Sequence, residues 1–259
     1  MSTFAVSRSG FVDRANEWLQ PARFKDYCPN GLQVEGRGEV CVLVSGVTAS
    51  LALIEAAIDE GADTILVHHG LFWRGQDGSL TGWLRKRVAK LIENNINLMA
   101  YHLPLDAHEK YGNNAQLAIQ LGLQTISTFG DQNLGHLGIN IDPSTQDTFS
   151  SADLALRAFK SLGKEPLLID PNPSRVLRRI AWCTGGAQSW FEDAIKAGAD
   201  AFVTGEISEP QAHLARESGV AFLACGHHAT ERYGVRALGD ALAQEFQISH
   251  RFIDIDNPA

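Results

Sequence analysis

Residues Val42–Gly70 read VLVSGVTASLALIEAAIDEGADTILVHHG and combine two hydrophobic patterns. The short apolar runs Val40–Val44 and Thr64–Val67 are typical of buried strands. Between them, Ala49–Glu60 has apolar residues at helical spacing, and Gly61 is placed to end that helix. The order strand, helix, strand predicts a parallel α/β unit.

The same alternation continues along the chain. A helix at Leu84–Asn94 precedes a strand at Ile96–Tyr101, and another helix is expected from Asn113 to Leu121. The amino-terminal segment Gly10–Leu19 has the apolar spacing of an amphipathic helix. Short apolar strands that alternate with helices favour a sheet covered on both faces.

The second half of the chain repeats the pattern of strands and helices predicted for the first. Arg179–Glu206 reads RIAWCTGGAQSWFEDAIKAGADAFVTGE, and Gly198 aligns with Gly61 at an offset of 198 − 61 = 137. At this offset, six of the nine residues from Glu55 to Asp63 are identical in the second copy. We interpret this as an internal duplication. The alternative is that a helix followed by Gly-Ala-Asp and a strand is a common arrangement in α/β proteins.

We therefore expect an α/β fold with two similar lobes from an internal duplication and mostly parallel sheets covered by helices. The first lobe is assigned to residues 1–125 and the second to 126–225. Residues 226–259 form a C-terminal segment that returns to the metal site and the first lobe. Between the halves, Thr125–Pro173 is rich in turn residues and has its own helix candidate at Ala152–Leu162.

Composition excludes several classes of protein. The 259 residues are 44% hydrophobic, which is too apolar for a disordered chain. The net charge of 22 − 30 = −8 argues against broad binding to a DNA backbone. The chain has no apolar run long enough for a membrane span and no apolar export segment near its start. Its four cysteines form no CxxC pair, so we expect reduced thiols in the cytoplasm.

Polar side chains gather where three predicted strands end. His68 and His69 end the first, His102 and Asp106 follow the second, and His227 follows the third. Because the carboxyl ends of parallel strands face a common crevice, we expect these clusters to meet. Imidazole and carboxylate together are ligands for divalent Zn, Fe, Mn, Ni or Co.

Two features suggest a pair of metal ions. Consecutive side chains such as His68 and His69 diverge, so each can address a different ion. His227 and Glu231 are four residues apart and share one face of a helix, and a carboxylate can bridge two ions. The adjacent His228 is the alternative ligand to His227. Each of these features also has a purely structural explanation. The histidines can simply end a strand, Thr230 can cap a helix, and Asp106 can cap the following turn.

Other positions are weaker candidates for chemistry. Glu206 and His102 are candidate catalytic groups for proton transfer or for orienting a ligand, although Glu206 is equally well read as a solvated carboxylate. The extra segment Phe72–Lys86 carries Phe72, Trp73 and Trp83, which suit a lid, an oligomer contact or core. The chain has no GxSxG, Walker A or GxGxxG motif, so neither a nucleophilic triad nor a glycine-loop nucleotide site is predicted.

An ordered set of motifs resembles the Nif-three-like family of dinuclear-metal hexameric proteins, whose bacterial members are labelled GTP cyclohydrolase I type 2 homologues. The motifs are NGLQVEG, SGVTAS, GADTILVHHGLFW, YHLPLDAH, GNNAQLA, TGEIS and GHHATERYG, and they extend over nearly the whole chain. The resemblance implies two α/β lobes without an inserted domain. It also implies a toroidal homohexamer, arranged as a trimer of dimers or a dimer of trimers, with two divalent metal ions per subunit.

The resemblance maps five metal ligands onto this chain: His68, His69, Asp106, His227 and Glu231, with Glu231 bridging. Two function hypotheses follow. The first is a metal-dependent hydrolase that acts on a nucleotide such as GTP or a related small molecule. The second is a non-catalytic metal-binding or metal-handling ring that works through protein or nucleic-acid partners. Metal-dependent turnover of nucleotides that is lost on changing Glu231 would separate the two.

Overall fold

The computed structural model describes residues 5–259, and their contacts divide the chain into two units. Unit 1 comprises the chain up to Gly112 together with Gly234–Asp256, and unit 2 comprises Asn113–Tyr233 with Asn257–Ala259. Residues 1–4 lie outside the described part. They belong to the amino-terminal segment in which we expect no export signal. The lobe borders predicted near residues 125 and 225 stay predictions.

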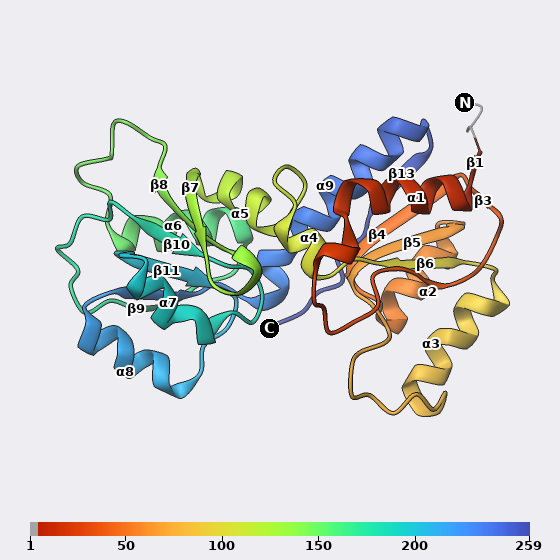
Figure 1. The fold of residues 1–259 in the computed structure, drawn as a ribbon, viewed down its shortest axis with the longest axis horizontal. Coiled ribbons are helices and arrows are strands. Elements are labelled where there is room, and N and C mark those ends of the chain that lie inside the picture. Colours follow the sequence, from red (N-terminus) through yellow and green to blue (C-terminus); the bar gives the residue numbers. More distant parts are fainter. Residues whose placement is uncertain (1–4) are drawn as a thin grey trace. The chain divides into compact units, whose positions relative to one another are not determined.

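Unit 1 is built on a five-stranded sheet in the order β13-β4-β5-β6-β2. Figure 1 labels β4, β5, β6 and β13 of this sheet. Strands β13, β4, β5 and β6 run parallel, and β2 closes the edge antiparallel to β6. The strands are β2 (Gly31–Val34), β4 (Val42–Thr48), β5 (Thr64–His69), β6 (Asn97–Ala100) and β13 (Ser249–Phe252). Outside the sheet, β1 (Val6–Ser7) pairs with β3 (Glu39–Val40).

Both faces of this sheet are buried because its side chains alternate between two cores. Val44 and Ile65 belong to one cluster, together with residues of the helices α2 and α3. Leu43 and Leu66 belong to the other, together with residues of α1 and α9. The helices in or entering unit 1 are α1 (Arg8–Leu19), η1 (Pro21–Arg23), α2 (Leu51–Asp59), α3 (Gly82–Glu93), α4 (Leu103–Ala107) and α9 (His227–Phe246), whose first turns belong to unit 2.

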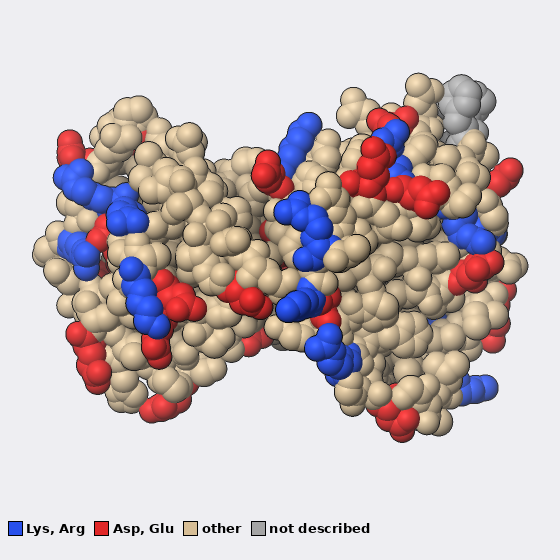
Figure 2. Space-filling model, in the orientation of Figure 1, with Lys and Arg blue, Asp and Glu red and all other residues tan. Residues whose placement is uncertain are grey.

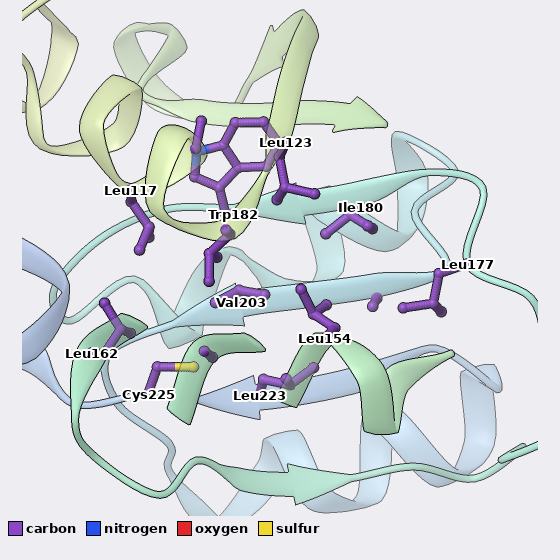
Figure 3. Packing of buried hydrophobic residues seen from close by; sticks show 14 of the residues in the cluster. Leu117, Leu123, Leu154, Leu162, Leu177, Ile180, Trp182, Val203, Leu223 and Cys225 are labelled. Atoms are coloured by element: carbon purple, nitrogen blue, oxygen red, sulfur yellow. The ribbon is translucent and has the colours of Figure 1, made fainter. Parts of the chain in front are cut away.

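Unit 2 has a six-stranded sheet in the order β7-β8-β10-β11-β12-β9. The strands are β7 (Leu123–Phe129), β8 (Gly135–Asn140), β9 (Leu167–Ile169), β10 (Ile180–Trp182), β11 (Ala201–Thr204) and β12 (Ala221–Ala224). The helices are α5 (Asn113–Leu121), η2 (Asp131–Asn133), α6 (Ser151–Leu162), η3 (Gln188–Trp190), α7 (Phe191–Lys196) and α8 (Glu209–Ser218). One core contains the fully buried Trp182 with Leu154, Val203 and Leu223 (Figure 3).

The predicted α/β class is confirmed, but the second sheet is more mixed than expected. Strands β10, β11 and β12 run parallel, while β7, β8 and β9 each pair antiparallel. The reason for the first antiparallel pair is local. Only a short connection at residues 130–134 joins β7 to β8, and Gly130 and Asn133 in it have positive φ. A connection this short closes a hairpin, whereas a parallel pair needs a long crossover.

The repeated Gly-Ala-Asp has the same local role in each unit. Gly61 and Gly198 have φ angles of 69° and 80°, left-handed conformations that suit glycine after a helix. The Asp63 carboxylate accepts from the amides of Cys41 and Val42, at the start of β4. In unit 2 the Asp200 carboxylate accepts in the same way from the amides that precede β10. The motif therefore anchors the preceding parallel strand, and the duplication itself stays a prediction.

None of the helices within residues 5–259 is long and apolar enough to cross a membrane. Cys28, Cys41, Cys183 and Cys225 are all free thiols.

Candidate metal centre

Unit 1 brings three imidazoles together at the end of its central strands. His68 and His69 are the last residues of β5, and His102 lies two residues after β6 ends. The His68 ring centroid is 4.5 Å from that of His69 and 5.0 Å from that of His102. One ring nitrogen from each of the three lies within 4.8 Å of the others. The rings of His68, His69 and His102 therefore lie next to one another at the end of the central strands.

Each of these imidazoles is held through its Nδ1 atom. His68 Nδ1 donates to the Tyr101 carbonyl at 2.9 Å. His102 Nδ1 lies 2.7 Å from Asp26 Oδ1, and His69 Nδ1 lies 3.1 Å from Thr48 Oγ1. A carbonyl or carboxylate at Nδ1 fixes the tautomer that has its lone pair on Nε2, which is the usual arrangement for metal-ligating histidine.

Asp26 is a candidate site residue that the sequence patterns do not predict. Its carboxylate also accepts from the Asn30 side chain at 2.8 Å and the Leu103 amide at 2.9 Å. Burial alone would raise the pKa of Asp26, but the hydrogen bonds from His102 and Asn30 lower it to about 2. The carboxylate is therefore ionised and is a strong acceptor for the His102 ring. The available signal is the polar loop DYCPNG at residues 26–31, whose turn residues by themselves indicate only an irregular segment.

Asp106 joins the imidazoles from helix α4. It is buried, and its Oδ1 lies 3.6 Å from His68 Nε2. A carboxylate oxygen and an imidazole nitrogen at this separation match two ligand positions around one cation. Asp106 lies inside α4, so it is not the N-cap of that helix, a position that His102 occupies.

Unit 2 places a second group on the first turn of α9. His227 Nε2 lies 3.3 Å from Glu231 Oε2, as expected for residues four apart on a helix. On its other side, His227 Nδ1 lies 2.7 Å from Glu206 Oε1, just after β11. Burial by itself would lower the pKa of His227, but the hydrogen bonds and charges of Glu231 and Glu206 raise it to about 9. Two carboxylates thus stabilise positive charge at this position.

The loop before η3 approaches Glu231 closely because it contains glycine. A Cβ on Gly185 would lie 2.2 Å from Glu231 Oε1, and the φ of Gly185 is 68°. Its amide donates to Thr230 Oγ1 at 3.0 Å, and that hydroxyl donates to the His227 carbonyl at 2.9 Å. Thr230 therefore ties this loop to the helix start, a stronger role than a simple cap.

The neighbouring His228 faces different surroundings from His227. It is buried, and its amide donates to the carbonyl of Ala259 at 3.3 Å. In unit 2, the group of His227, Glu231 and Glu206 forms without it. This placement favours His227 over His228 as the metal-ligating residue.

The extra segment after β5 contributes an aromatic side chain to the unit 1 group. The Trp73 ring centroid is 5.1 Å from that of His102, edge to face, and 5.9 Å from that of His69. Trp83 is different because it is half exposed and lies under the Arg87 guanidinium at 4.8 Å. Of these two tryptophans, Trp73 is thus the one placed next to the candidate ligands.

A third polar cluster connects serine, histidine and aspartate, a combination that sequence motifs did not predict. His250 lies with Nε2 2.8 Å from Ser45 Oγ and Nδ1 2.7 Å from Asp240 Oδ1. This is the connectivity of a nucleophilic triad. However, Ser45 is fully buried in the middle of β4, where no substrate carbonyl can reach it. We therefore interpret the cluster as a structural brace.

Nearly the whole chain matches one family model. The model, described as Duf34/NIF3 (NGG1p interacting factor 3), covers residues 6–258. The chain belongs to the DUF34/NIF3 family. A relative named GTP cyclohydrolase 1 type 2 homolog, from Pseudomonas aeruginosa, is 51% identical over 98% of this chain and 100% of its own. One of the same name from Neisseria meningitidis serogroup A is 49% identical with the same coverage.

Solved structures superpose closely on this chain. Protein ybgI, described as of unknown function, has a TM-score of 0.92 at 45% identity and covers 98% of this chain and 100% of that one. A protein from Thermus thermophilus, TTHA1606, has a TM-score of 0.86 at 32% identity with the same coverage. The family and fold expected from the sequence motifs are thereby confirmed. The clusters of His, Asp and Glu can hold metal ions.

Proposed function

We propose that the chain is a metal-dependent hydrolase with two divalent ions per subunit. In this proposal the ligands are His68, His69 and Asp106 from unit 1 and His227 and Glu231 from unit 2, with Glu231 bridging. The supporting observation is that each unit arranges its own imidazoles and carboxylates in advance, with ring nitrogens held at Nδ1. Imidazole and carboxylate without thiolate suit Fe, Mn, Zn, Ni or Co.

The surrounding residues have separate roles in this proposal. When bound, paired divalent ions supply Lewis acidity and activate water for attack near neutral pH. Glu206 accepts from His227 Nδ1 and so orients that ring. The other Glu206 oxygen accepts from the side-chain amide of Gln188 at 3.2 Å, and the Glu206 side chain is 43% exposed. Glu206 is therefore reachable from solvent and is our first candidate for proton transfer, with His102 as the second.

The substrate class rests on the relatives. Their name, GTP cyclohydrolase 1 type 2 homolog, supports a nucleotide or a related small molecule as the substrate of this chain. The aromatic ring of Trp73 beside His69 and His102 adds an apolar surface at the unit 1 group, next to which a planar base can pack.

The test combines metal content with turnover. Protein without a histidine tag is purified without chelator, and metal per chain is measured beside GTP turnover for wild type and Glu231→Gln. We expect about two ions per chain in wild type, and a loss of at least about 100-fold in turnover in the variant, because a bridging ligand serves both ions. The exposed Glu217→Gln is the matched control and keeps both properties.

The outcomes separate the two function hypotheses. Full turnover by Glu231→Gln would overturn the proposal of a hydrolytic metal centre that has Glu231 as a ligand. Two ions per chain without turnover of any nucleotide would favour the non-catalytic, metal-handling protein instead. For that alternative, protein partners are favoured over nucleic acid. The net charge is −8, and on the face in Figure 2 basic side chains are interspersed with acidic ones.

We also propose that the chain assembles as a homohexameric ring. Several large apolar side chains of unit 2 are about half exposed or more, and α5 packs against both α6 and β7, which carry some of them. These residues are Ile119 on α5, Ile126 on β7, and Leu156 and Phe159 on α6. Exposed apolar side chains on adjacent elements favour association with further copies. Light scattering from the purified chain gives the number of copies per particle.

A further inference from the structure

We propose that Tyr27 and Arg74 form a nucleotide-recognition surface beside His102, in which the Tyr27 ring packs against the base and the Arg74 guanidinium binds a phosphate group. For its substrate class the inference rests on the proposed function. It adds the residues that distinguish a nucleotide from the corresponding nucleoside. All of these residues belong to unit 1.

The first observation is an exposed aromatic ring. Tyr27 is 54% exposed, and its ring centroid lies 6.2 Å from that of His102, with the two planes 60° apart. Trp73 meets the same imidazole at 5.1 Å, with an angle of 84° between the planes. Contact with His102 thus leaves about half of the Tyr27 surface open to solvent. Nucleobases stack on exposed aromatic rings because every base has a flat π-face.

The second observation is that Arg74 lies at the corner of a closed turn. The Trp73 amide donates to Gln76 Oε1 at 3.0 Å, and the Gln76 amide donates to the Trp73 carbonyl at 3.1 Å. Between them, Gly75 has a φ of 83°, which is the conformation that glycine supplies at the third residue of such a turn. The backbone of Arg74 is therefore held in place, although its side chain lies in an exposed segment.

The third observation is that Arg74 is joined to the loop that carries Tyr27. The Arg74 amide donates to the Tyr27 carbonyl at 2.6 Å, and Arg74 Nη2 donates to the Asp26 carbonyl at 2.8 Å. The Asp26 carboxylate is instead occupied by His102 and Asn30. In the described part of the chain, no carboxylate lies within 4.0 Å of the Arg74 guanidinium. Its charge and its other N–H donors are therefore available to an anionic ligand.

The alternative role for Arg74 is a clip between two loops. Its two hydrogen bonds to residues 26 and 27 would be sufficient for that role. A clip, however, has no preference for one ligand over another. A guanidinium that binds phosphate oxygens through charge-assisted hydrogen bonds favours a nucleotide over its nucleoside. The preference between these two ligands therefore separates the two roles.

The experiment measures binding rather than turnover. The full chain is dialysed to equilibrium against labelled GTP or labelled guanosine, with a chelator present so that no metal ion contributes to phosphate binding. We expect wild type to bind GTP at least about 10-fold more tightly than guanosine, because hydrogen bonds to charged groups are strong. Inorganic triphosphate should compete with GTP and not with guanosine.

Variants of the arginine test the phosphate contact. Arg74→Gln should weaken GTP binding by at least about 10-fold and leave guanosine binding unchanged. Arg74→Lys keeps the charge and should retain more of the preference for GTP than Arg74→Gln does. The control is Arg85→Gln, an exposed arginine on α3, which should bind both ligands like wild type.

Variants of the aromatic ring test the base contact. Tyr27→Leu should weaken binding of GTP and guanosine by the same factor, about 5-fold or more, because both ligands carry the base. Trp83→Leu is the matched control, since Trp83 is also 54% exposed and lies on α3. It should leave both affinities unchanged. Unchanged affinities in Tyr27→Leu would overturn the assignment of this ring.

The outcomes distinguish this inference from the proposed hydrolase. A preference for GTP that Arg74→Gln retains, equal loss of both ligands in Arg74→Gln, or no preference in wild type would each overturn the phosphate assignment. Binding of GTP that depends on Arg74 in a protein without nucleotide turnover would overturn the hydrolase and leave this inference standing. Turnover of GTP by the metal-loaded protein with the same KM in wild type and Arg74→Gln would do the reverse.

Discussion

At the scale of single residues, His136 makes the stability of unit 2 depend on pH. This histidine is buried on β8 beside Trp182, and burial lowers its pKa from 6.5 to about 4. The unfolded chain therefore binds a proton between pH 6.5 and 4 that the folded chain does not. Stability is lost as pH falls through this window. Between pH 7 and pH 5 we expect His136 to contribute a loss of about 2 kcal/mol in the free energy of unfolding.

Urea unfolding followed by tryptophan fluorescence at the two pH values measures this loss. His136→Gln should remove that part of the pH dependence, and the exposed His213→Gln should not. Equal pH dependence in wild type and His136→Gln would show that the His136 ring is protonated equally in the folded and unfolded chain.

The site residues differ in how far sequence could predict them. His68, His69 and His227 follow apolar strand patterns, so their place at strand ends was predictable from position alone. Asp26 lies 76 residues from His102 in an irregular loop, and only the fold brings the two together. The same holds for Ser45 and His250, which are 205 residues apart. Contacts between distant loops and edge strands leave no periodic signal.

At the scale of elements, a side-chain hydrogen bond joins the edge strand β13 to β4 in addition to their parallel pairing. The parallel partner β4 supplies Ser45, whose hydroxyl contacts His250 at 2.8 Å, and Gly239 on α9 leaves room for the imidazole ring. Ser45→Ala leaves a buried ring nitrogen without this partner. We expect it to lower the free energy of unfolding by about 1–3 kcal/mol.

Chemical denaturation measures the difference. The matched control is Ser249→Ala, an exposed serine on β13 itself, which should stay within about 0.5 kcal/mol of wild type. If both variants had the same stability as wild type, β13 would not depend on this bond.

Elements with a strong local signal were predicted, and weak ones were not. Helices α2 and α6 have Ser50 and Ser150 as caps with apolar periodicity behind them, and both were expected within two residues of their bounds. The strands β9 and β13 are only three and four residues long and partly exposed. Their place at sheet edges is set by tertiary pairing, which a short window of sequence does not record.

At the scale of the whole molecule, the proposed dinuclear centre links the unfolding of two units that have separate cores. The chain passes between the units after Gly112, Tyr233 and Asp256. Each unit has its own hydrophobic clusters and its own candidate ligands. An ion that binds only the native state stabilises it by about 2.7 kcal/mol at a free concentration of about 100 times its Kd. If ligands from both units share the ions, chelation should destabilise both.

Differential scanning calorimetry with and without chelator measures this coupling. We expect chelated wild type to melt lower, with its two units separating into distinct transitions, because no shared ligand then joins them. Glu231→Gln should keep only the metal-dependent stabilisation that arises from the imidazoles of unit 1. The exposed Glu217→Gln serves as the control and should respond to chelator like wild type. A calorimetric scan of wild type that chelator leaves unchanged would contradict metal binding in either unit, whereas an equal response in Glu231→Gln would confine the metal to unit 1.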